Sequence, residues 1–203
     1  MDGIIFDVDG TLWNSTDAVA KAWTKAIEEN SDLDLIVDAP LLNRIFGKTM
    51  DEICDIVFPM LPLEERTHLG DLCFENQLLA EEPCPVFDGV KETFQKLSKK
   101  HKLFIVSNCA CGYIEVMLST SGLDKYVTDT LCFGQTNTSK GKTIRTLMER
   151  NNLKDVVYVG DTQGDADACK EADVPFIFAE YGFGDVPDAK TRIKDITGLT
   201  TLF

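Results

Sequence analysis

Polar side chains and glycines occur at several places where the sequence predicts that a buried strand ends. They are Asp7, Asp9, Gly10 and Thr11 after the first apolar run, Ser107 and Asn108 after a later run, and Gly160, Asp161 and Asp165 after a third. A lysine, Lys140, opens the predicted helix that precedes the third run. Because ligands of open α/β sheets bind beyond the carboxyl ends of the strands, we expect these residues to converge at one edge of a sheet.

This combination of side chains suits the cleavage of a phosphate ester. A carboxylate such as Asp7 can attack phosphorus and form an aspartyl-phosphate, and a second carboxylate, Asp9, can protonate the leaving oxygen and later deprotonate water. Crowded carboxylates repel one another, so a divalent cation is needed to hold them, and oxygen ligands suit Mg²⁺. Backbone N–H groups and side chains would bind the phosphoryl oxygens, and the candidates are Gly10, Ser107, Asn108 and Lys140.

Four segments, in this order along the chain, resemble the motifs of the haloacid dehalogenase superfamily. They are DVDGT at 7–11, VSN at 106–108, Lys140 and GDTQGD at 160–165. The resemblance extends over the whole chain and is to the phosphoglycolate phosphatase and β-phosphoglucomutase-like group, in which a helical cap follows the first strand. It implies a nucleophilic Asp7, a general acid/base Asp9, and Mg²⁺ held by Asp7, the Asp9 carbonyl and Asp161.

The resemblance also implies roles for further residues. Ser107 and Lys140 would bind phosphate, Asp165 would be a direct or indirect partner of Mg²⁺, and the DVDGT strand would be central in the sheet. Dehalogenases and phosphonate-cleaving relatives lack a carboxylate at the position of Asp9, since neither reaction protonates a leaving alkoxide in the same way. The carboxylate therefore points to phosphate-ester hydrolysis or to a phosphomutase.

Two lysines compete for the phosphate-binding position. We prefer Lys140 to Lys142, although the proline that often follows this lysine in the superfamily is replaced by Gly141. The segment Gly141-Lys142-Thr143 also looks like the end of a nucleotide-binding P-loop. Thr136 occupies the position of the required glycine, however, so we reject that interpretation.

The segment Phe46-Gly47-Lys48 lies between two helical patterns and resembles the cap loop that reaches over the active site in related enzymes. Gly47 and Lys48 are therefore candidate substrate contacts. Lys48, with Arg44 as a further candidate, is expected to meet a second anionic group on the substrate. The alternative is that Lys48 is a solvated lysine next to a helix cap.

The remaining sequence has to position these residues. The predicted strands are Ile4–Val8, Leu103–Val106, Thr130–Phe133, Val156–Val159 and Phe176–Ala179. Helical patterns separate the later strands, at Val90–Leu97, Gly112–Thr120, Lys142–Asn151 and Asp165–Glu171. Apolar strands that alternate with helices are typical of a parallel sheet covered on both faces. The sequence therefore predicts an α/β fold with a doubly wound, Rossmann-like parallel sheet.

The stretch after the first strand shows only helices and turns. Two helices are predicted to begin after Ser15 and Thr49, which are possible N-caps. A third is predicted to run from about Leu63 to Leu79. We therefore expect an all-helical cap domain inserted after the first strand. The predicted domains are an α/β core at 1–14 and 84–203 and a cap at 15–83.

Composition limits the possible partners. The chain of 203 residues has 20 Lys and Arg against 34 Asp and Glu, a formal charge of −14. Phosphate backbones and acidic lipids do not attract such a surface, so neither nucleic acid nor a membrane is expected as a partner. No apolar run approaches the roughly 18 residues of a membrane span, and no basic segment precedes an apolar stretch at the N-terminus, so we expect no signal peptide.

The seven cysteines include no CxxC pair and fit a reducing cytoplasm, which is the predicted location. We expect mostly small, buried thiols. For Cys109 and Cys111, which follow Ser107 and Asn108, the alternative is sensitivity to oxidation.

These observations predict a cytoplasmic, Mg²⁺-dependent phosphatase that hydrolyses a small phosphorylated metabolite through an aspartyl-phosphate. The alternatives are a sugar phosphomutase and a non-catalytic phosphate-binding or regulatory protein. The sequence yields no prediction of the physiological substrate or of the oligomeric state.

Overall fold

The computed structural model describes residues 1–79 and 84–203. The predicted boundary between the cap and the core, at Pro83, lies outside the described residues, so the division into two domains stays a prediction. No helix in the described part of the chain is long and apolar enough to cross a membrane.

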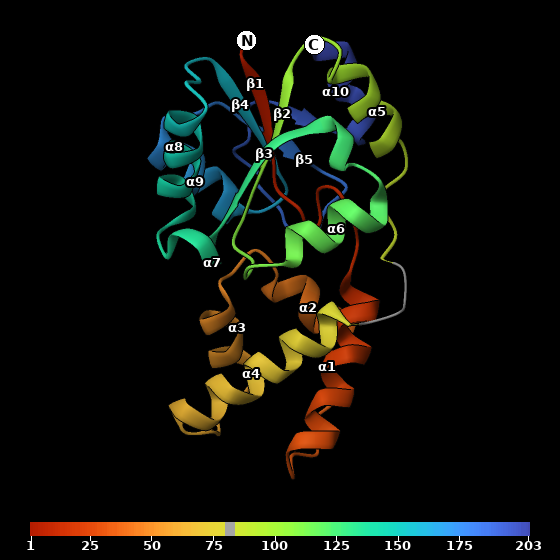
Figure 1. The fold of residues 1–203 in the computed structure, drawn as a ribbon, viewed down its shortest axis with the longest axis vertical. Helices are drawn as coiled ribbons and strands as arrows, with labels where there is room; N and C mark the ends of the chain where they lie inside the picture. Colours follow the sequence, from red (N-terminus) through yellow and green to blue (C-terminus); the bar gives the residue numbers. More distant parts are fainter. Residues whose placement is uncertain (80–83) are drawn as a thin grey trace.

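A parallel sheet forms the centre of the larger part of the molecule (Figure 1). Its strands are β1 (Gly3–Phe6), β2 (Lys102–Ser107), β3 (Val127–Cys132), β4 (Val156–Gly160), β5 (Phe176–Ala179) and β6 (Arg192–Ile193). They lie in the order β3-β2-β1-β4-β5-β6, and every neighbouring pair is parallel. Since β1 lies between β2 and β4, its carboxyl end lies near the middle of the edge that the carboxyl ends of the strands form. The predicted fold class is confirmed.

Helices cover both faces of the sheet because successive side chains of each strand point to opposite faces. On one face, Ile4, Phe6 and Ile105 pack with α5 (Val90–Leu97) and α6 (Tyr113–Ser121). On the other face, Ile5 and Tyr158 pack with α8 (Lys140–Arg150) and α9 (Gln163–Ala172). The shorter elements are η1 (Asp124–Tyr126), α7 (Phe133–Thr136), η2 (Ile196–Gly198) and α10 (Leu199–Leu202).

Four helices follow β1 and lie below the carboxyl ends of the strands in Figure 1. They are α1 (Thr16–Asn30), α2 (Ala39–Ile45), α3 (Met50–Val57) and α4 (Leu63–Leu78). These helices bury a hydrophobic cluster of their own around Trp23, Leu42 and Phe58. The predicted N-cap at Thr49 is confirmed, and it forms a capping box in which the side chains of Thr49 and Glu52 bond reciprocally to the backbone.

Some elements differ from the prediction. The first strand ends at Phe6 rather than Val8, because the chain turns at Gly10, where φ is +78°. The third strand begins at Val127, three residues earlier than predicted. Its first residues were missed because they are mostly polar and only partly buried, so they form no apolar run. The sequence analysis missed α2, which is only seven residues long, and β6, which has two.

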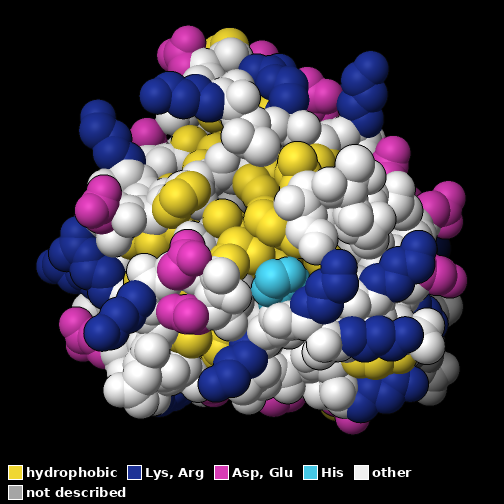
Figure 2. Space-filling view, turned by 90° about the horizontal axis from the view of Figure 1, so that it is seen from above, with side chains coloured by type: hydrophobic (Ala, Val, Ile, Leu, Met, Phe, Trp, Pro, Cys, Tyr) yellow, Lys and Arg dark blue, Asp and Glu magenta, His cyan; other side chains and the backbone are white. Residues whose placement is uncertain are grey.

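The end of the molecule opposite the cap carries both chain termini (Figure 1). In Figure 2, hydrophobic side chains occupy the middle of this end, and many lysines and arginines, with some acidic side chains among them, lie around it. A surface pocket between α5 and α10 has the same character, because Leu97 and Phe203 line it together with Lys96, Lys99 and Lys100. The acidic net charge is therefore not spread evenly over the molecule.

Candidate active site

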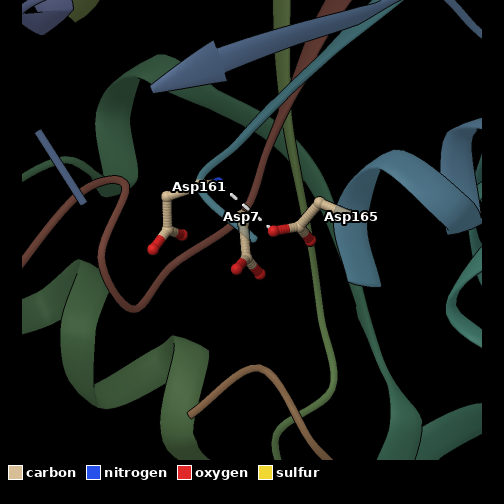
Figure 3. A group of neighbouring side chains, drawn as sticks. All are labelled: Asp7, Asp161 and Asp165. Carbon is tan, nitrogen blue, oxygen red and sulfur yellow. Dashed lines mark hydrogen bonds between the residues drawn. The ribbon is translucent and has the colours of Figure 1, made fainter. Parts of the chain in front are cut away.

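Three buried carboxylates meet at the carboxyl edge of the sheet (Figure 3). Asp7 directly follows β1, and its N–H donates to the Val159 carbonyl at 2.9 Å. Asp161 directly follows β4, and Asp165 lies in the first turn of α9. One carboxylate oxygen from each lies within 4.8 Å of the others. The structure therefore brings together three acids that are more than 150 residues apart at their extremes.

Lys140 is the cation that contacts this cluster. Its Nζ lies 3.0 Å from Asp7 Oδ1 and 2.6 Å from Asp165 Oδ1, and the side chain is buried. The position follows from α8, which begins at Lys140 with Ser139 as its N-cap. Lys142, the competing residue, is exposed on the same helix. The structure places Lys140, and not Lys142, beside Asp7.

The charges of the cluster do not balance. Burial raises the pKa of Asp7 well above its ordinary value, the Asp165 charge adds to this, and Lys140 opposes it. Burial and Asp165 likewise raise the pKa of Asp161 to about 7. Burial by itself would lower the pKa of Lys140, but Asp165 and Asp7 raise it above its usual range. One buried ammonium group thus faces three carboxylates, and a divalent cation would supply the missing positive charge.

The donor set fits Mg²⁺, which prefers carboxylate, carbonyl and water oxygens. Asp7 and Asp161 offer carboxylate oxygens, with no sulfur or imidazole among the group. Asp165 is different, because both of its oxygens are already engaged. Oδ1 accepts from Lys140, and Oδ2 accepts from the N–H groups of Asp161 (3.2 Å) and Thr162 (3.0 Å) and from the Thr162 hydroxyl (2.7 Å). The arrangement makes Asp165 the residue that orients Lys140 and the turn before α9.

Gly10 contributes space rather than a donor. A Cβ atom at Gly10 would lie 2.1 Å from Asp161 Oδ2, and its φ of +78° is one that L side chains rarely adopt. The N–H of Gly10 itself donates to the Trp13 carbonyl at 3.1 Å, and phosphate binding by N–H groups near Gly10 stays a prediction. Asp161 Oδ1 accepts from the Thr11 hydroxyl (3.1 Å) and Oδ2 from the Phe183 N–H (2.8 Å).

Asp9 is held by three donors on a single carboxylate oxygen. Oδ1 accepts from Trp13 Nε1 (3.0 Å), Ser15 Oγ (2.7 Å) and the Tyr113 hydroxyl (2.6 Å). Burial raises the pKa of Asp9, and these hydrogen bonds oppose the shift. The sequence analysis missed Tyr113. It identified Ser15 only as a helix cap, whereas the Ser15 side chain makes no cap hydrogen bond.

The other predicted phosphate-binding residues lie at the end of β2. Ser107 is buried and lines the same cavity as Asp7 and Asp9. Asn108 lines it as well, and its Nδ2 donates to the Gly47 carbonyl at 2.7 Å. This hydrogen bond connects the sheet edge directly to the predicted cap loop.

The helical insert lines this cavity mainly with apolar side chains. Trp23, Phe46, Met50, Ile53 and Phe74 form most of the cap side of the lining, and Gln77 and Lys48 add polar groups there. The cavity has a volume of about 40 Å³, room for a few water molecules.

The two cations of the cap loop are placed differently. Lys48 is exposed but borders both the cavity and an outer groove between α2 and the start of α9. Arg44 borders the outer groove and is not among the residues that line the cavity.

A family model for haloacid dehalogenase-like hydrolases matches residues 4–179. The chain belongs to this family. The predicted superfamily is therefore confirmed, and with it the prediction that the protein is a hydrolase. The matched range contains the three carboxylates, Lys140 and all four cap helices. A search of curated proteins by sequence finds no significant match.

Solved structures with the same fold cover almost the entire chain. A predicted phosphatase from Clostridium acetobutylicum has a TM-score of 0.83 and 19% identity, over 99% of this chain and 97% of its own. A predicted phosphoglycolate phosphatase from Haemophilus somnus has a TM-score of 0.84 and 20% identity, over 100% and 97%. A subfamily IA hydrolase of this superfamily from Geobacter sulfurreducens has a TM-score of 0.74 and 19% identity, over 100% and 96%. At these identities the similarity shows a common fold.

Proposed function

We propose that the protein is a Mg²⁺-dependent phosphatase that hydrolyses a small phosphate monoester through an aspartyl-phosphate on Asp7. The observation that carries the proposal is the contact of buried Asp7 with Lys140, at 3.0 Å, beside two further buried carboxylates. Several of the similar solved structures are named as phosphatases or phosphoglycolate phosphatases, which supports the same chemistry.

The two carboxylates of the DVDGT segment have different environments and therefore different roles. Asp7, paired with Lys140 and kept from bulk water, attacks phosphorus, and the bond from phosphorus to the leaving oxygen breaks. Asp9, whose raised pKa favours the protonated form, gives its proton to the leaving oxygen. It then takes a proton from the water that attacks the phosphorus of the aspartyl-phosphate, and the bond to Asp7 breaks.

The other residues bind and orient the phosphoryl group. Mg²⁺, held by Asp7, Asp161 and the Asp9 carbonyl, would neutralise the charge of the phosphoryl oxygens. Ser107 and Asn108 offer a hydroxyl and an amide from the end of β2, and Lys140 offers its ammonium group. Asp165 holds Lys140 in place.

The lining of the cap indicates the class of substrate. Apolar side chains cover most of the cap side of the cavity, and Lys48 is the cap cation that borders it. The organic part of the substrate is therefore small and largely apolar, with at most one further anionic group near Lys48. The cavity of about 40 Å³ does not hold such a molecule, so the cap has to open for the substrate to enter.

The small volume of the cavity favours the alternative, a sugar phosphomutase, because such an enzyme has to keep water from its aspartyl-phosphate. The apolar cap wall argues against it, since the hydroxyls of a sugar would lose their hydrogen bonds to water there. We therefore prefer the phosphatase.

The test is the release of phosphate from p-nitrophenyl phosphate and from a panel of short alkyl and hexose phosphates, with Mg²⁺ and with EDTA. We expect Mg²⁺-dependent release that is lost in Asp7→Asn and kept in the matched control Asp167→Asn, an exposed residue of α9. Activity of Asp7→Asn near that of the wild type would refute the proposal. Turnover of a hexose phosphate that needs a sugar bisphosphate and releases no phosphate would identify the phosphomutase.

A further inference from the structure

Three cysteines lie together at the carboxyl ends of β2 and β3. Cys132 is the last residue of β3 and pairs with Ser107 of β2, while Cys109 and Cys111 belong to the loop that follows β2. The two loops are in direct contact, because the Gly134 N–H donates to the Cys109 carbonyl at 3.1 Å. A Cβ atom at Gly134 would lie 3.0 Å from Cys111 Sγ. Backbone packing therefore holds these thiols close to one another.

The Cys132 sulfur is the acceptor in this group. The Gln135 N–H donates a hydrogen bond to it, and the Cys109 and Cys111 side chains lie beside it. These contacts lower the pKa of Cys132 to about 6, against the effects of burial and of the Glu115 carboxylate. The same contact with Cys132 raises the pKa of Cys109. A cysteine with a lowered pKa thus lies beside a second cysteine, which is the arrangement of an attacking and a resolving cysteine.

Two of the three residues leave an approach to the group for a small oxidant. Cys111 is exposed, Cys109 is half-buried and lines the cavity that contains Asp7, and Cys132 is buried behind them. This differs from the sequence analysis, which expected buried thiols at 109 and 111. Two cap cysteines offer a contrast, since burial raises the pKa of Cys54 to about 11 and that of Cys73 to about 12.

We propose that Cys132 and Cys109 form a peroxide-sensitive pair that closes to a disulfide. The Cys132 thiolate attacks a hydroperoxide, the O–O bond breaks, and a sulfenic acid forms on Cys132 with release of hydroxide. The Cys109 sulfur then attacks the sulfenic sulfur, and the hydroxide that leaves takes the Cys109 proton as water. In sum, two thiols and hydrogen peroxide give one disulfide and two water molecules.

The disulfide would act on the phosphate-binding loop, a consequence that rests on the proposed function. Cys109 is two residues after Ser107, whose hydroxyl donates to the Cys109 sulfur, and it directly follows Asn108. A covalent bond to Cys132 ties this loop to β3 and changes the position of the Ser107 and Asn108 side chains. A small misplacement of such groups costs catalysis heavily, so oxidation is expected to inhibit the enzyme reversibly.

The first experiment detects the disulfide itself. The native protein is treated with stoichiometric hydrogen peroxide, its remaining thiols are blocked, and it is digested with trypsin without reductant. We expect the peptide 103–125, which carries Cys109 and Cys111, joined to the peptide 126–140, which carries Cys132. Cys132→Ser and Cys109→Ser should lose this cross-link, while Cys111→Ser and the matched control Cys84→Ser, a half-exposed cysteine elsewhere, should keep it.

Absence of the cross-link in the wild type would overturn the proposal, and so would its persistence in Cys109→Ser. These readouts are chemical and hold even if the phosphatase assignment fails. The second experiment follows p-nitrophenyl phosphate hydrolysis, in which oxidation should lower the activity by about tenfold or more, reversibly with dithiothreitol. Cys132→Ser should resist the inhibition. A cross-linked protein that keeps full activity would overturn the proposal that the disulfide inhibits the enzyme. A reduced protein without activity would count against the proposed function.

Discussion

Lys140 illustrates how strongly a single residue depends on its surroundings at this site. It shares a helix with Lys142, but the first lysine is buried between Asp7 and Asp165 while the second is exposed to solvent. A buried ammonium group with two carboxylate partners remains charged and stays in one place. An exposed lysine two residues later has neither property, so the two residues should respond very differently to substitution.

We expect Lys140→Met to lower kcat/KM by at least about 10²-fold, as the loss of one positioned charge at a transition state does, while Lys142→Met stays within about twofold. The measurement is steady-state hydrolysis of p-nitrophenyl phosphate. Removing one partner of a buried pair also destabilises the fold, so circular dichroism has to show that Lys140→Met is folded at the assay temperature. The reverse ranking of the two variants would show that Lys142 is the functional lysine.

Protons and Mg²⁺ are expected to compete for Asp161, because its pKa is raised to about 7. Each pH unit below this value should weaken Mg²⁺ binding by about tenfold, since one proton is displaced for each ion bound. The raised pKa of Asp161 also makes the stability of the metal-free protein depend on pH. A carboxyl group whose pKa is higher in the folded state favours folding when protonated, so the metal-free protein loses this contribution as pH rises from about 4 to 7.

Mg²⁺ should therefore raise Tm more at about pH 8 than at about pH 5.5, because only the ionised carboxylates bind it. The measurement is thermal unfolding with Mg²⁺ or EDTA at both pH values. Asp161→Asn is the control, and it should abolish most of the Mg²⁺-dependent shift. Equal shifts at the two pH values would contradict the assignment of Asp161 as a ligand.

At the scale of elements, the two predicted helix N-caps of the helical insert, Ser15 and Thr49, have different roles. Thr49 caps α3 with a reciprocal capping box. Ser15 occupies the corresponding position before α1, but its hydroxyl donates to Asp9, and Asn14 bonds to the Thr16 N–H instead. The Ser15 side chain thus contacts the candidate active site, whereas the Thr49 side chain stabilises a helix.

Thr49→Ala should lower the free energy of unfolding by about 1 kcal/mol, the usual cost of a lost N-cap. Ser15→Ala should instead act on turnover, because Asp9 loses a hydrogen bond that fixes its carboxylate, and the pH dependence of kcat should shift. Urea denaturation and kcat measured over a pH range separate the two effects. A change of kcat in Thr49→Ala as large as that in Ser15→Ala would contradict this division.

At the scale of the whole molecule, the helical insert and the sheet have separate hydrophobic clusters that meet around the active site. The cap loop contacts the sheet edge through the hydrogen bond from Asn108 to Gly47 and through the rings of Phe46 and Phe183, whose centroids are 6.1 Å apart. Phe74 and Leu78 of α4 also pack against the core cluster, so a movement of the helical insert would have to break both sets of contacts.

Phe183→Ala should favour the open state, because it removes the ring contact and leaves the backbone N–H that binds Asp161. The contact should favour the closed state by about 1 kcal/mol, so its loss should raise KM several-fold. Mg²⁺ binding should stay unchanged. Faster amide hydrogen exchange around Phe46, with no change in the core strands, is the structural measurement. Unchanged exchange and KM would show that this contact does not control closure.

The sequence alone determined the α/β class, the place of the helical insert, most core strands and helices, and the acidic residues of the site. These features are encoded locally, since alternation of apolar runs and helices and the short DVDGT and GDTQGD segments each involve only a few adjacent residues. The elements α2 and β6 were not predicted because seven and two residues are too few to show a period.

Only the tertiary structure decided which side chains meet. The Tyr113 hydroxyl donates to Asp9, which is 104 positions away in the sequence, and the Phe183 N–H donates to Asp161, which is 22 positions away. The use of the Gly10 N–H within its own loop and the meeting of Cys109 with Cys132 were likewise beyond the sequence pattern. The physical reason is that periodicity specifies an element and its buried face, whereas contacts between distant elements depend on how their side chains pack in three dimensions.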